Sequence, residues 1–297
     1  MNKFLTREDL VKLDKELKMI PLTYDLMFKN VFTDDLDILK EFLILETSLD
    51  LDPKETSITL LNNELSKENK NEYKKTIDIY ISLNDNVNIN CELNNSNFNE
   101  AYSLRNGIYE SKLFSMMLEK GEKPKDIIDK KLIQLNLNTK DLNINYGEDI
   151  LMTYGIKTGN FYLKNKKTIL KYLAYYKKMY YTFDIKLNKD ELWLVVILSE
   201  KFTELYDLLG ELLTDEKRDK FIRKVIKMSK DTFILSEWEK EKMDELKELA
   251  RLKDAEDKGI EKSKLDIAKN MLESNMSIDM ISKFTGLSTE EIENLRN

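Results

Sequence analysis

Two acidic side chains and one amide, Asp78, Glu92 and Asn94, fall on the same face of a predicted β-hairpin in "TIDIYISLNDNVNINCELNN" (residues 76–95). Strand side chains alternate between faces, and pairing outward from a turn centred on Asp85 sets Asp78 opposite Glu92. Cross-strand neighbours lie about 5 Å apart at Cβ, where two carboxylates repel unless they share a proton or a cation. The three side chains therefore form an oxygen set suited to Mg²⁺ or Mn²⁺.

The same alternation has a simpler interpretation, in which the hairpin belongs to an antiparallel sheet with one buried face and one wet face. Like charges directly opposite each other are disfavoured in such a plain hairpin, and this favours the metal site. The hairpin pattern by itself leaves both interpretations open.

Residue types that are missing restrict the chemistry further. The 297 residues contain no His, which excludes Ser-His-Asp triads, Cys-His pairs and HExxH zinc sites. Cys91 is the single cysteine, so intrachain disulfides and zinc ribbons are excluded as well. Hydrolysis would have to use carboxylates, lysines, hydroxyls or a hard cation held by oxygen ligands.

The composition is that of a soluble globular protein, with 41% hydrophobic and 35% charged residues. Only 8 Gly and 3 Pro indicate long regular elements, mostly helices. No apolar run is long enough to span a bilayer, and the amino-terminal segment does not resemble a signal peptide, so we expect no membrane partner and a cytoplasmic protein. The net charge of −7 argues weakly against a nucleic-acid binder.

The elements that would position these residues follow from periodicity and turn signals. We expect helices at 2–19 (with Thr6 as N-cap), 23–32, 34–47 and 99–121, strands at 57–65, 75–83, 87–94 and 130–138, strand-like pieces near 159–165 and 179–187, and almost only helices from Lys189 onward. This order predicts an α/β (α+β) core with a mostly antiparallel start.

The carboxyl-terminal part is predicted to be a charged, exposed helix followed by three short helices. Ser277 and Ser288 are expected N-caps, and Gly286 marks a turn. The tail could form a helix-turn-helix, but its last helix is acidic at the end that would face the DNA groove. A recognition helix normally presents hydrogen-bond donors to bases and phosphates there. We therefore interpret it as a packing or partner-binding module. The charged helix is a candidate for self-association, although its apolar seam is irregular.

Three segments together, "TYDLMFKNVF", the hairpin and "YSLRNGIYESKLFSMMLEKG", resemble the PD-(D/E)XK nuclease family transposases, the Rpn family of recombination-promoting nucleases. That family combines D-x-x-F-K-x-x-F, a strand with Asp, a strand ending in Glu-x-Gln, and a helix with Arg-x-x-x-Tyr and a glycine. The matching residues here are Asp25, Phe28, Lys29, Phe32, Asp78, Glu92, Asn94, Arg105, Tyr109 and Gly121. The tail is also similar to the family's carboxyl terminus.

The resemblance implies a restriction-endonuclease-like core, a mixed β-sheet flanked by helices, over residues 1–235. A charged connecting helix at 236–264 and a small helix-turn-helix-like tail at 265–297 would follow. It also implies a Mg²⁺-dependent (or Mn²⁺-dependent) endodeoxyribonuclease, a hydrolase of DNA recombination that cleaves phosphodiester bonds.

By the same resemblance, Asp78 and Glu92 are the metal ligands, and Asn94 occupies the position that orients the attacking water. The family has Lys or Gln there, so we expect a weakened site and a faster enzyme after Asn94→Gln or Asn94→Lys. Asp25 is a candidate third acid, or else an ordinary helix amino-terminal acid. Arg105 is a phosphate contact or a surface residue, and Tyr109 is expected to pack rather than catalyse.

A basic segment supplies candidate nucleic-acid contacts. Residues 157–189 hold nine Lys and one acid, Asp184, interleaved with aromatic residues. Lysines contact phosphates and aromatic rings stack on bases. The alternative is that the aromatics pack a core whose rim the lysines solvate, and we favour it for most of the aromatics. The candidate contacts are Lys164, Lys166, Lys167, Lys177 and Lys178.

Three functions remain open from the sequence. The preferred one is the metal-dependent DNA endonuclease, whose partners are DNA and a second copy of the chain through the carboxyl-terminal helices. A second is a catalytically inactive DNA-binding or assembly protein that retains the nuclease fold. A third is an unrelated interaction domain with an amphipathic hairpin.

Overall fold

The computed structural model describes most of the 297-residue chain. The described residues are 4–61, 64–65, 75–76, 78–95, 100–118, 123–141, 144–152 and 164–295. They form two compact units that divide between Leu235 and Ser236. None of the helices in these residues is long and apolar enough to cross a membrane.

The first unit contains helices before, between and after its strands. They are α1 (Arg7–Glu16), α2 (Asp25–Phe32), α3 (Leu36–Glu46), α4 (Glu100–Met116), the 3-10 helix η1 (Pro124–Ile127), α5 (Leu173–Phe183), α6 (Lys189–Ile197), α7 (Phe202–Leu212) and α8 (Asp215–Ser229). Thr6 caps α1 and Asp9 returns the hydrogen bond, which confirms the predicted start of that helix.

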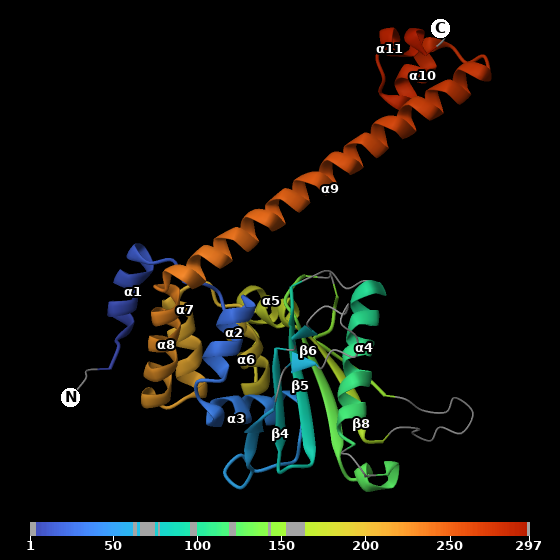
Figure 1. The fold of residues 1–297 in the computed structure, drawn as a ribbon. Helices are drawn as coiled ribbons and strands as arrows, with labels where there is room; N and C mark the ends of the chain where they lie inside the picture. The colour runs from blue at the N-terminus through green and yellow to red at the C-terminus, as the bar shows by residue number, and fades with distance from the viewer. Residues whose placement is uncertain are drawn as a thin grey trace. The chain divides into compact units, whose positions relative to one another are not determined.

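The first unit is built around one mixed sheet of six strands, in the order β1-β4-β5-β6-β8-β7 (Figure 1). β5 and β6 run parallel, as do β6 and β8, and the other neighbours are antiparallel. The strands are β1 (Ile58–Leu60), β4 (Ile79–Leu83), β5 (Val87–Asn94), β6 (Lys131–Asn138), β7 (Glu148–Leu151) and β8 (Lys166–Tyr172), and β2 (Glu64–Leu65) and β3 (Lys75–Thr76) form a separate pair. The predicted fold class, a mixed sheet flanked by helices, is confirmed.

The two faces of this sheet differ in chemistry, although both are covered. One face carries apolar side chains such as Ile81, Ile89 and Leu135, all buried, and α2, α3 and α6 lie on that side (Figure 1). Phe28, Phe32, Phe42, Trp193 and Phe221 form the aromatic core among these helices. α2 therefore rests on a rigid layer, which fixes where its polar residues project.

The opposite face of the central strands is polar and lies beneath α4. Tyr80, Leu113, Met117 and Leu132 make a small apolar cluster between that helix and the sheet. The remaining positions on this face are mostly amides and acids: Asn88, Asn90, Glu92 and Asn94 on β5, and Gln134, Asn136 and Asn138 on β6. Every residue of β5 except Asn88 is buried.

One alternative interpretation and one expectation about the strands are therefore wrong. The hairpin has no wet face, because α4 covers the side that period-two alternation marked as polar. The strand-like piece near 179–187 lies largely within α5, whose buried Leu173 and Tyr176 follow helical spacing instead. The other strand-like piece, near 159–165, falls mostly outside the described residues, as does Gly121.

The second unit begins within α9 (Thr232–Glu273) and continues through α10 (Ile278–Thr285) and α11 (Thr289–Asn294). The first of the three expected short helices is the end of α9, because no helix stop precedes Asn275, which adopts a φ of 58°. Ser277 and Ser288 cap α10 and α11 as predicted, and Gly286 ends α10 with a φ of 72°. Ala268, Ile281, Leu287 and Ile292 form the core of this small unit.

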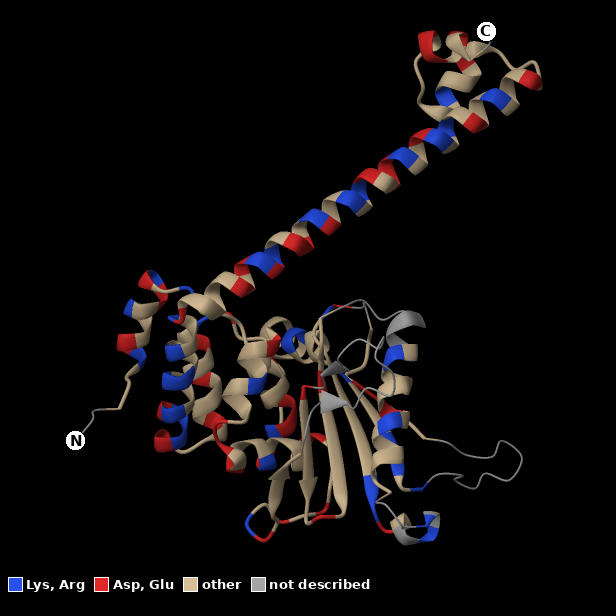
Figure 2. Cartoon of the chain, viewed as in Figure 1, with Lys and Arg blue, Asp and Glu red and all other residues tan. Residues whose placement is uncertain are grey.

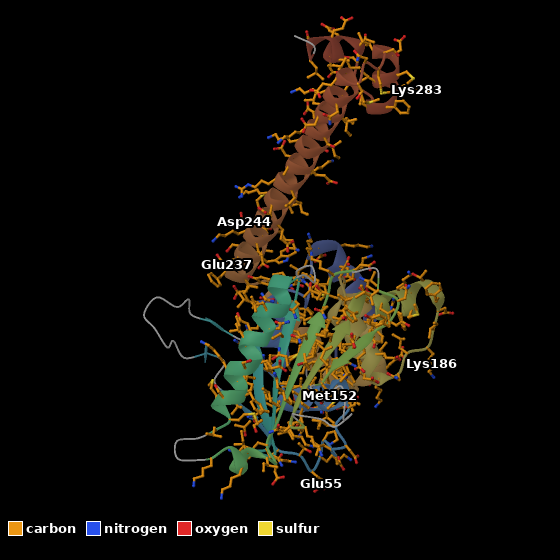
Figure 3. The ribbon with its side chains drawn as sticks, turned by 90° about the vertical axis from the view of Figure 1, so that its right-hand side faces the viewer. Glu55, Met152, Lys186, Glu237, Asp244 and Lys283 are labelled. Atoms are coloured by element: carbon orange, nitrogen blue, oxygen red, sulfur yellow. The ribbon has the colours of Figure 1, made fainter. Side chains whose placement is uncertain are left out.

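The middle of α9 is exposed on all sides, as predicted for the charged helix. Acidic and basic residues alternate along it, as Figure 2 shows; Asp244 is one of the exposed acids, and Glu237, near the start of the helix, is half-buried (Figure 3). Ion pairs three or four residues apart, such as Lys247–Asp244 at 2.9 Å and Lys258–Asp254 at 2.7 Å, stabilise the helix locally.

Candidate active site

The hairpin between β4 and β5 has the register that the turn predicted. Ile79 pairs with Cys91 and Leu83 pairs with Val87, so the residue numbers of each pair sum to 170. Asp78 stands one residue before β4, and the same register sets it beside Glu92. Asn84 and Asp85 in the turn have positive φ values of 49° and 56°, which these residue types tolerate.

Asp78 is fixed by the neighbouring strand rather than left to solvent. Its Oδ2 accepts a hydrogen bond from the backbone N–H of Leu93 at 2.7 Å. Burial raises the pKa of Asp78, while this hydrogen bond and the positive charges of Lys29 and Arg105 lower it. The carboxylate is thus held at the carboxyl end of β5, with cations on two other elements acting on it.

Glu92 is only 6% exposed and lies on the polar face of the sheet. Burial raises its pKa to about 8, and repulsion from Asp78 adds to the shift. The backbone N–H of Asp78 donates to the Glu92 carboxylate, and Asn90 donates from Nδ2 to Oε1 at 3.1 Å. Near neutral pH, Glu92 therefore retains a proton unless a cation replaces it.

An amide network supports Glu92 from beneath. Asn90 Nδ2 also donates to Gln134 Oε1 at 2.8 Å, and Gln134 Nε2 donates to Asn136 Oδ1 at 3.1 Å. Asn90 pairs with Gln134 across the strands, and Glu92 pairs with Asn136. The parallel register therefore builds a fully buried polar row next to the acid.

Asp25 joins the same region from the first turn of α2. Asn95 Nδ2, just after β5, donates to the backbone carbonyl of Thr23 at 2.6 Å and anchors the start of this helix to the sheet. Burial raises the pKa of Asp25 to about 6, Asp78 raises it further and Arg105 opposes the shift. Asp25 is thus both a helix amino-terminal acid and a neighbour of the carboxylate pair.

Asn94 and Arg105 contact each other. Arg105 on α4 donates from Nη2 to Asn94 Oδ1 at 2.8 Å, so Arg105 reaches into the site although the residue is largely exposed. Asn94 is 1% exposed, and its Nδ2 has no hydrogen-bond partner among the described residues. The Asn94 oxygen therefore already accepts one hydrogen bond, and within the described part of the chain its NH₂ group has no acceptor.

Tyr109 lies one helical turn after Arg105 and is half buried. It packs against the cluster of Tyr80, Leu113, Met117 and Leu132, which confirms the expected packing role. Arg105, Glu92 and Asp78 all influence its pKa, which burial raises, so the phenol also borders the site.

The sequence analysis assigned Lys29 no role beyond its place in the D-x-x-F-K-x-x-F motif. It follows Asp25 by four residues on α2, and its positive charge acts on Asp78. The i,i+4 spacing to Asp25 was the available signal, because residues four apart share one face of a helix.

The carboxylates of Asp78 and Glu92 are suitable ligands for a hard cation, but they are only two ligands. Within the residues that the structure describes, no group of three or more His, Cys, Asp or Glu side chains is arranged to hold a metal ion. Mg²⁺ is commonly held by one or two carboxylates, with water and substrate phosphates completing its shell. The pair of Asp78 and Glu92 provides such a set.

The candidate DNA-contacting lysines do not share one surface. Lys166 pairs with Glu110 on α4 at 3.0 Å, whereas Lys167 donates to the carbonyl of Thr47 on the opposite side of the sheet at 3.4 Å. Lys177 pairs with Glu200 at 3.2 Å. Lys164 and Lys178 are exposed, as is Lys186 of the same segment (Figure 3).

The aromatic residues of that segment divide as well. Tyr172 and Tyr176 are buried, in line with the core interpretation, and Tyr181 is exposed. Phe161 and Tyr162 fall outside the described residues.

A second buried ionic cluster lies on the other face of the sheet, among residues to which the sequence analysis assigned no role. Lys171 on β8 contacts Glu148 at 2.6 Å and Glu46 at 3.4 Å. Glu46 is fully buried, and burial raises its pKa to about 8, with Lys171 opposing and Asp190 adding to the shift. This cluster joins α3, β7 and β8.

Comparison with known proteins bears on the carboxyl-terminal segment. Residues 261–297 match the family model described as the Rpn/YhgA-like nuclease family, C-terminal HTH domain. Neither the curated proteins nor the solved structures give a match. The carboxyl-terminal segment is therefore similar to the C-terminal HTH domain of the Rpn/YhgA-like nuclease family, and this supports the resemblance to the Rpn family.

Proposed function

We propose that this chain is a metal-dependent DNA endonuclease of the recombination-promoting, transposase-like class. The observation that carries the proposal is the approach of Asp78 and Glu92 at the ends of paired strands, with burial and repulsion raising the pKa of Glu92 to about 8. Two acids in this arrangement are stable when a cation lies between them. The family match at residues 261–297 supports a nuclease-related function.

Asp78 and Glu92 would hold Mg²⁺ or Mn²⁺. The bound cation would polarise a phosphate oxygen and lower the pKa of its water. The chain contributes orientation, because the Leu93 N–H fixes Asp78 and the Asn90 amide fixes Glu92. Rigid supports of this kind keep ligands in a productive geometry.

The reaction would be hydrolysis of a phosphodiester. The oxygen of a water molecule bonds to phosphorus while the ester P–O bond to the leaving alkoxide breaks. The proton of the attacking water passes to Asp25 or to solvent, and a second water protonates the alkoxide. Asp25 suits this transfer because its pKa of about 6 lies near neutral pH.

Asn94 would act by holding Arg105, since its oxygen accepts the guanidinium N–H at 2.8 Å. The guanidinium would then offset phosphate charge beside the carboxylates, because a planar fork of donors matches phosphate oxygens. This role differs from that of a residue that deprotonates water.

DNA would also be bound through the HTH domain at residues 261–297. Helix α11 carries Glu290, Glu291 and Glu293, so phosphate contacts are expected from other parts of that domain. Self-association is proposed through α9, which exposes the apolar side chains of Met243, Leu246, Leu249, Leu252, Ile260 and Ile267.

One observation favours the second candidate, a DNA-binding or assembly protein without catalysis. The Asn94 oxygen accepts a hydrogen bond from Arg105, and among the described residues no third His, Cys, Asp or Glu joins the carboxylate pair in a metal-binding group. Such a protein would retain DNA without cutting it.

Nicking of supercoiled plasmid in Mg²⁺ or Mn²⁺ separates the two candidates. We expect the wild type to nick, and Asp78→Asn and Glu92→Gln, which preserve side-chain shape, to lose at least about 100-fold in rate. Equal nicking by all three proteins would reveal a contaminating nuclease. DNA retention without nicking by the wild type would favour the non-catalytic candidate.

A further inference from the structure

We propose that the outer face of α4 packs against the same face of a second copy of the chain. This face is a narrow stripe, called here the α4 stripe, which consists of Leu104, Gly107, Ile108, Ser111 and Ser115. The contact is separate from the association proposed through α9, and it does not depend on the nuclease chemistry.

Helical spacing places the α4 stripe on the side of the helix that points away from the sheet. Successive residues of an α-helix are about 100° apart, so positions 104, 107, 108, 111 and 115 fall within about 100° of arc. The opposite side of α4, with Glu110, Leu113 and Met117, is buried against the sheet. The stripe therefore belongs to the outer surface of the layer that α4 forms over the polar face (Figure 1).

The α4 stripe is uncharged and largely apolar, in a chain whose residues are 35% charged. Leu104 and Ile108 are 65% and 40% exposed, although both side chains are large and apolar. The serine hydroxyls donate within the helix, from Ser111 Oγ to the carbonyl of Gly107 and from Ser115 Oγ to the carbonyl of Lys112, each at 2.7 Å. An apolar partner can cover these serines without removing their hydrogen bonds.

Gly107 is not required by packing within one copy of the chain. A Cβ added at this position would meet no atom within 4 Å, and the residue lies inside the regular part of α4. Glycine inside a helix is destabilising relative to alanine, because it loses more backbone entropy on folding. A glycine at the middle of an exposed apolar stripe instead suits the close approach of another backbone from outside the chain.

The occupant that fits the α4 stripe is a second α4 in the antiparallel orientation. The amino-terminal half of the stripe carries the large side chains of Leu104 and Ile108, and the carboxyl-terminal half carries the small ones of Ser111 and Ser115. A two-fold axis through the middle of the stripe lays the large half of each copy on the small half of the other, with Gly107 opposite Ser111.

The absence of charge on the α4 stripe also favours a second copy over DNA. Two identical uncharged faces meet without like-charge repulsion, whereas DNA binding depends on cations that contact phosphates. The paired helices would touch over about three turns, which is small beside the about 1,200–2,000 Å² that stable interfaces bury. We therefore expect a reversible dimer.

The test is the formation of disulfides between copies of the full-length chain. Cys91 is the single cysteine and is buried, so one introduced cysteine supplies the accessible thiol. Gly107→Cys and Ser111→Cys are oxidised with copper–phenanthroline, each alone and as an equal mixture, at about 100 µM because contacts of this size are weak. We expect the mixture to form the disulfide-linked dimer at least about fivefold faster than either variant alone, since a disulfide requires closely opposed Cβ atoms.

A second pair of substitutions tests the surface without a cysteine in the contact being the only change. Adding Ile108→Glu to both cysteine variants should slow disulfide formation at least about tenfold, because the contact would bury an unpaired carboxylate. Adding Ile128→Glu is the matched control, since Ile128 is an exposed isoleucine outside the α4 stripe, and it should leave the rate unchanged. Melting temperatures should match for all these proteins, because both isoleucines are exposed.

The remaining outcomes would overturn the inference. A mixture that reacts no faster than Ser111→Cys mixed with Lys227→Cys, whose cysteine lies at an exposed position of α8, would refute the antiparallel contact. Equal rates after Ile108→Glu and Ile128→Glu would show that the α4 stripe is not the interface. Disulfide formation that occurs only when duplex DNA is added would show that DNA, rather than the stripe, brings the copies together.

Discussion

A hydrogen bond between Asp78 and Leu93 links the two strands of the hairpin. The backbone N–H of Leu93 donates to Asp78 Oδ2, with 2.7 Å between the nitrogen and the oxygen. In the other direction, the backbone N–H of Asp78 donates to the carboxylate of Glu92. This reciprocal arrangement holds two acids together, although their mutual repulsion opposes it. The consequences for cations, protons and neighbouring side chains can each be measured.

Binding of a divalent cation should release protons. Glu92 has a pKa of about 8, so below that pH a proton competes with the cation for the carboxylate. We expect Mn²⁺ affinity to rise as pH increases from 6.5 to 8.5, by up to about tenfold per pH unit below the pKa. Calorimetry in two buffers of different ionisation enthalpy measures the proton count. Affinity that is independent of pH would show that Glu92 is ionised before the cation arrives.

Replacing Asn94 by lysine should slow nicking. The sequence alone suggested a gain, but the oxygen of Asn94 accepts a hydrogen bond from Arg105, and a lysine ammonium would repel that guanidinium. We expect Asn94→Lys to lose about 10- to 100-fold in rate, because a positioned cation leaves the site. Asn94→Gln retains a carbonyl and should lose less. A rate increase in Asn94→Lys would mean that Arg105 has no role in the reaction.

Removing the amide beneath Glu92 should weaken both the fold and the site. Asn90→Leu deletes the donor to Glu92 and leaves Gln134 Oε1 without its partner. We expect a loss of about 1–3 kcal/mol in the free energy of unfolding and about 10- to 100-fold weaker Mn²⁺ binding. Denaturant titration and calorimetry measure the two effects. Asn88→Leu, on the same strand outside the amide network, is the matched control, and equal effects of the two substitutions would refute the assignment.

The second ionic cluster predicts a pH-dependent stability. Glu46 has a pKa of about 8 in the folded chain, against an ordinary value of 4.5. Between these values the unfolded chain loses the proton while the folded chain keeps it, so this group makes stability fall as pH rises, by at most about 1.4 kcal/mol per pH unit.

Glu46→Gln removes that titration while preserving the shape of the side chain. Relative to the wild type, the variant should therefore gain stability from pH 5 to pH 8 and keep a constant difference above pH 8. Denaturant unfolding at pH 5, 6.5, 8 and 9 measures the difference. Parallel curves for the two proteins would show that Glu46 is ionised in the folded state and compensated by Lys171.

The parts of the site that the sequence predicted are those set by local geometry. The turn centre fixed the pairing of β4 with β5, and period-two alternation placed Glu92 and Asn94 on one face. The same alternation could not reveal that α4 covers this face. A row of polar residues has the same sequence pattern whether its hydrogen-bond partners are water molecules or buried amides. Asn90 and Gln134 acquire meaning only through the parallel pairing of β5 with β6.

The remaining features that the sequence did not predict depend on contacts between residues far apart in the chain. Lys166 and Lys167 are neighbours in the sequence, but strand alternation sends them to opposite faces, where Glu110 and Thr47 meet them. A charge count over residues 157–189 cannot anticipate these partners. The effect of the Lys29 charge on Asp78 was overlooked for a related reason, because the two residues are 49 positions apart in the sequence.

The most direct test of the carboxylate pair is the stoichiometry and affinity of Mn²⁺ binding to the folded protein, measured by calorimetry at pH 8.5. The account predicts one high-affinity site per chain in the wild type, lost in Asp78→Asn and in Glu92→Gln while both variants stay folded. It also predicts that Glu46→Gln, on the opposite face of the sheet, retains the site. Mn²⁺ binding that survives either substitution at Asp78 or Glu92 unchanged would contradict the assignment of these residues as ligands.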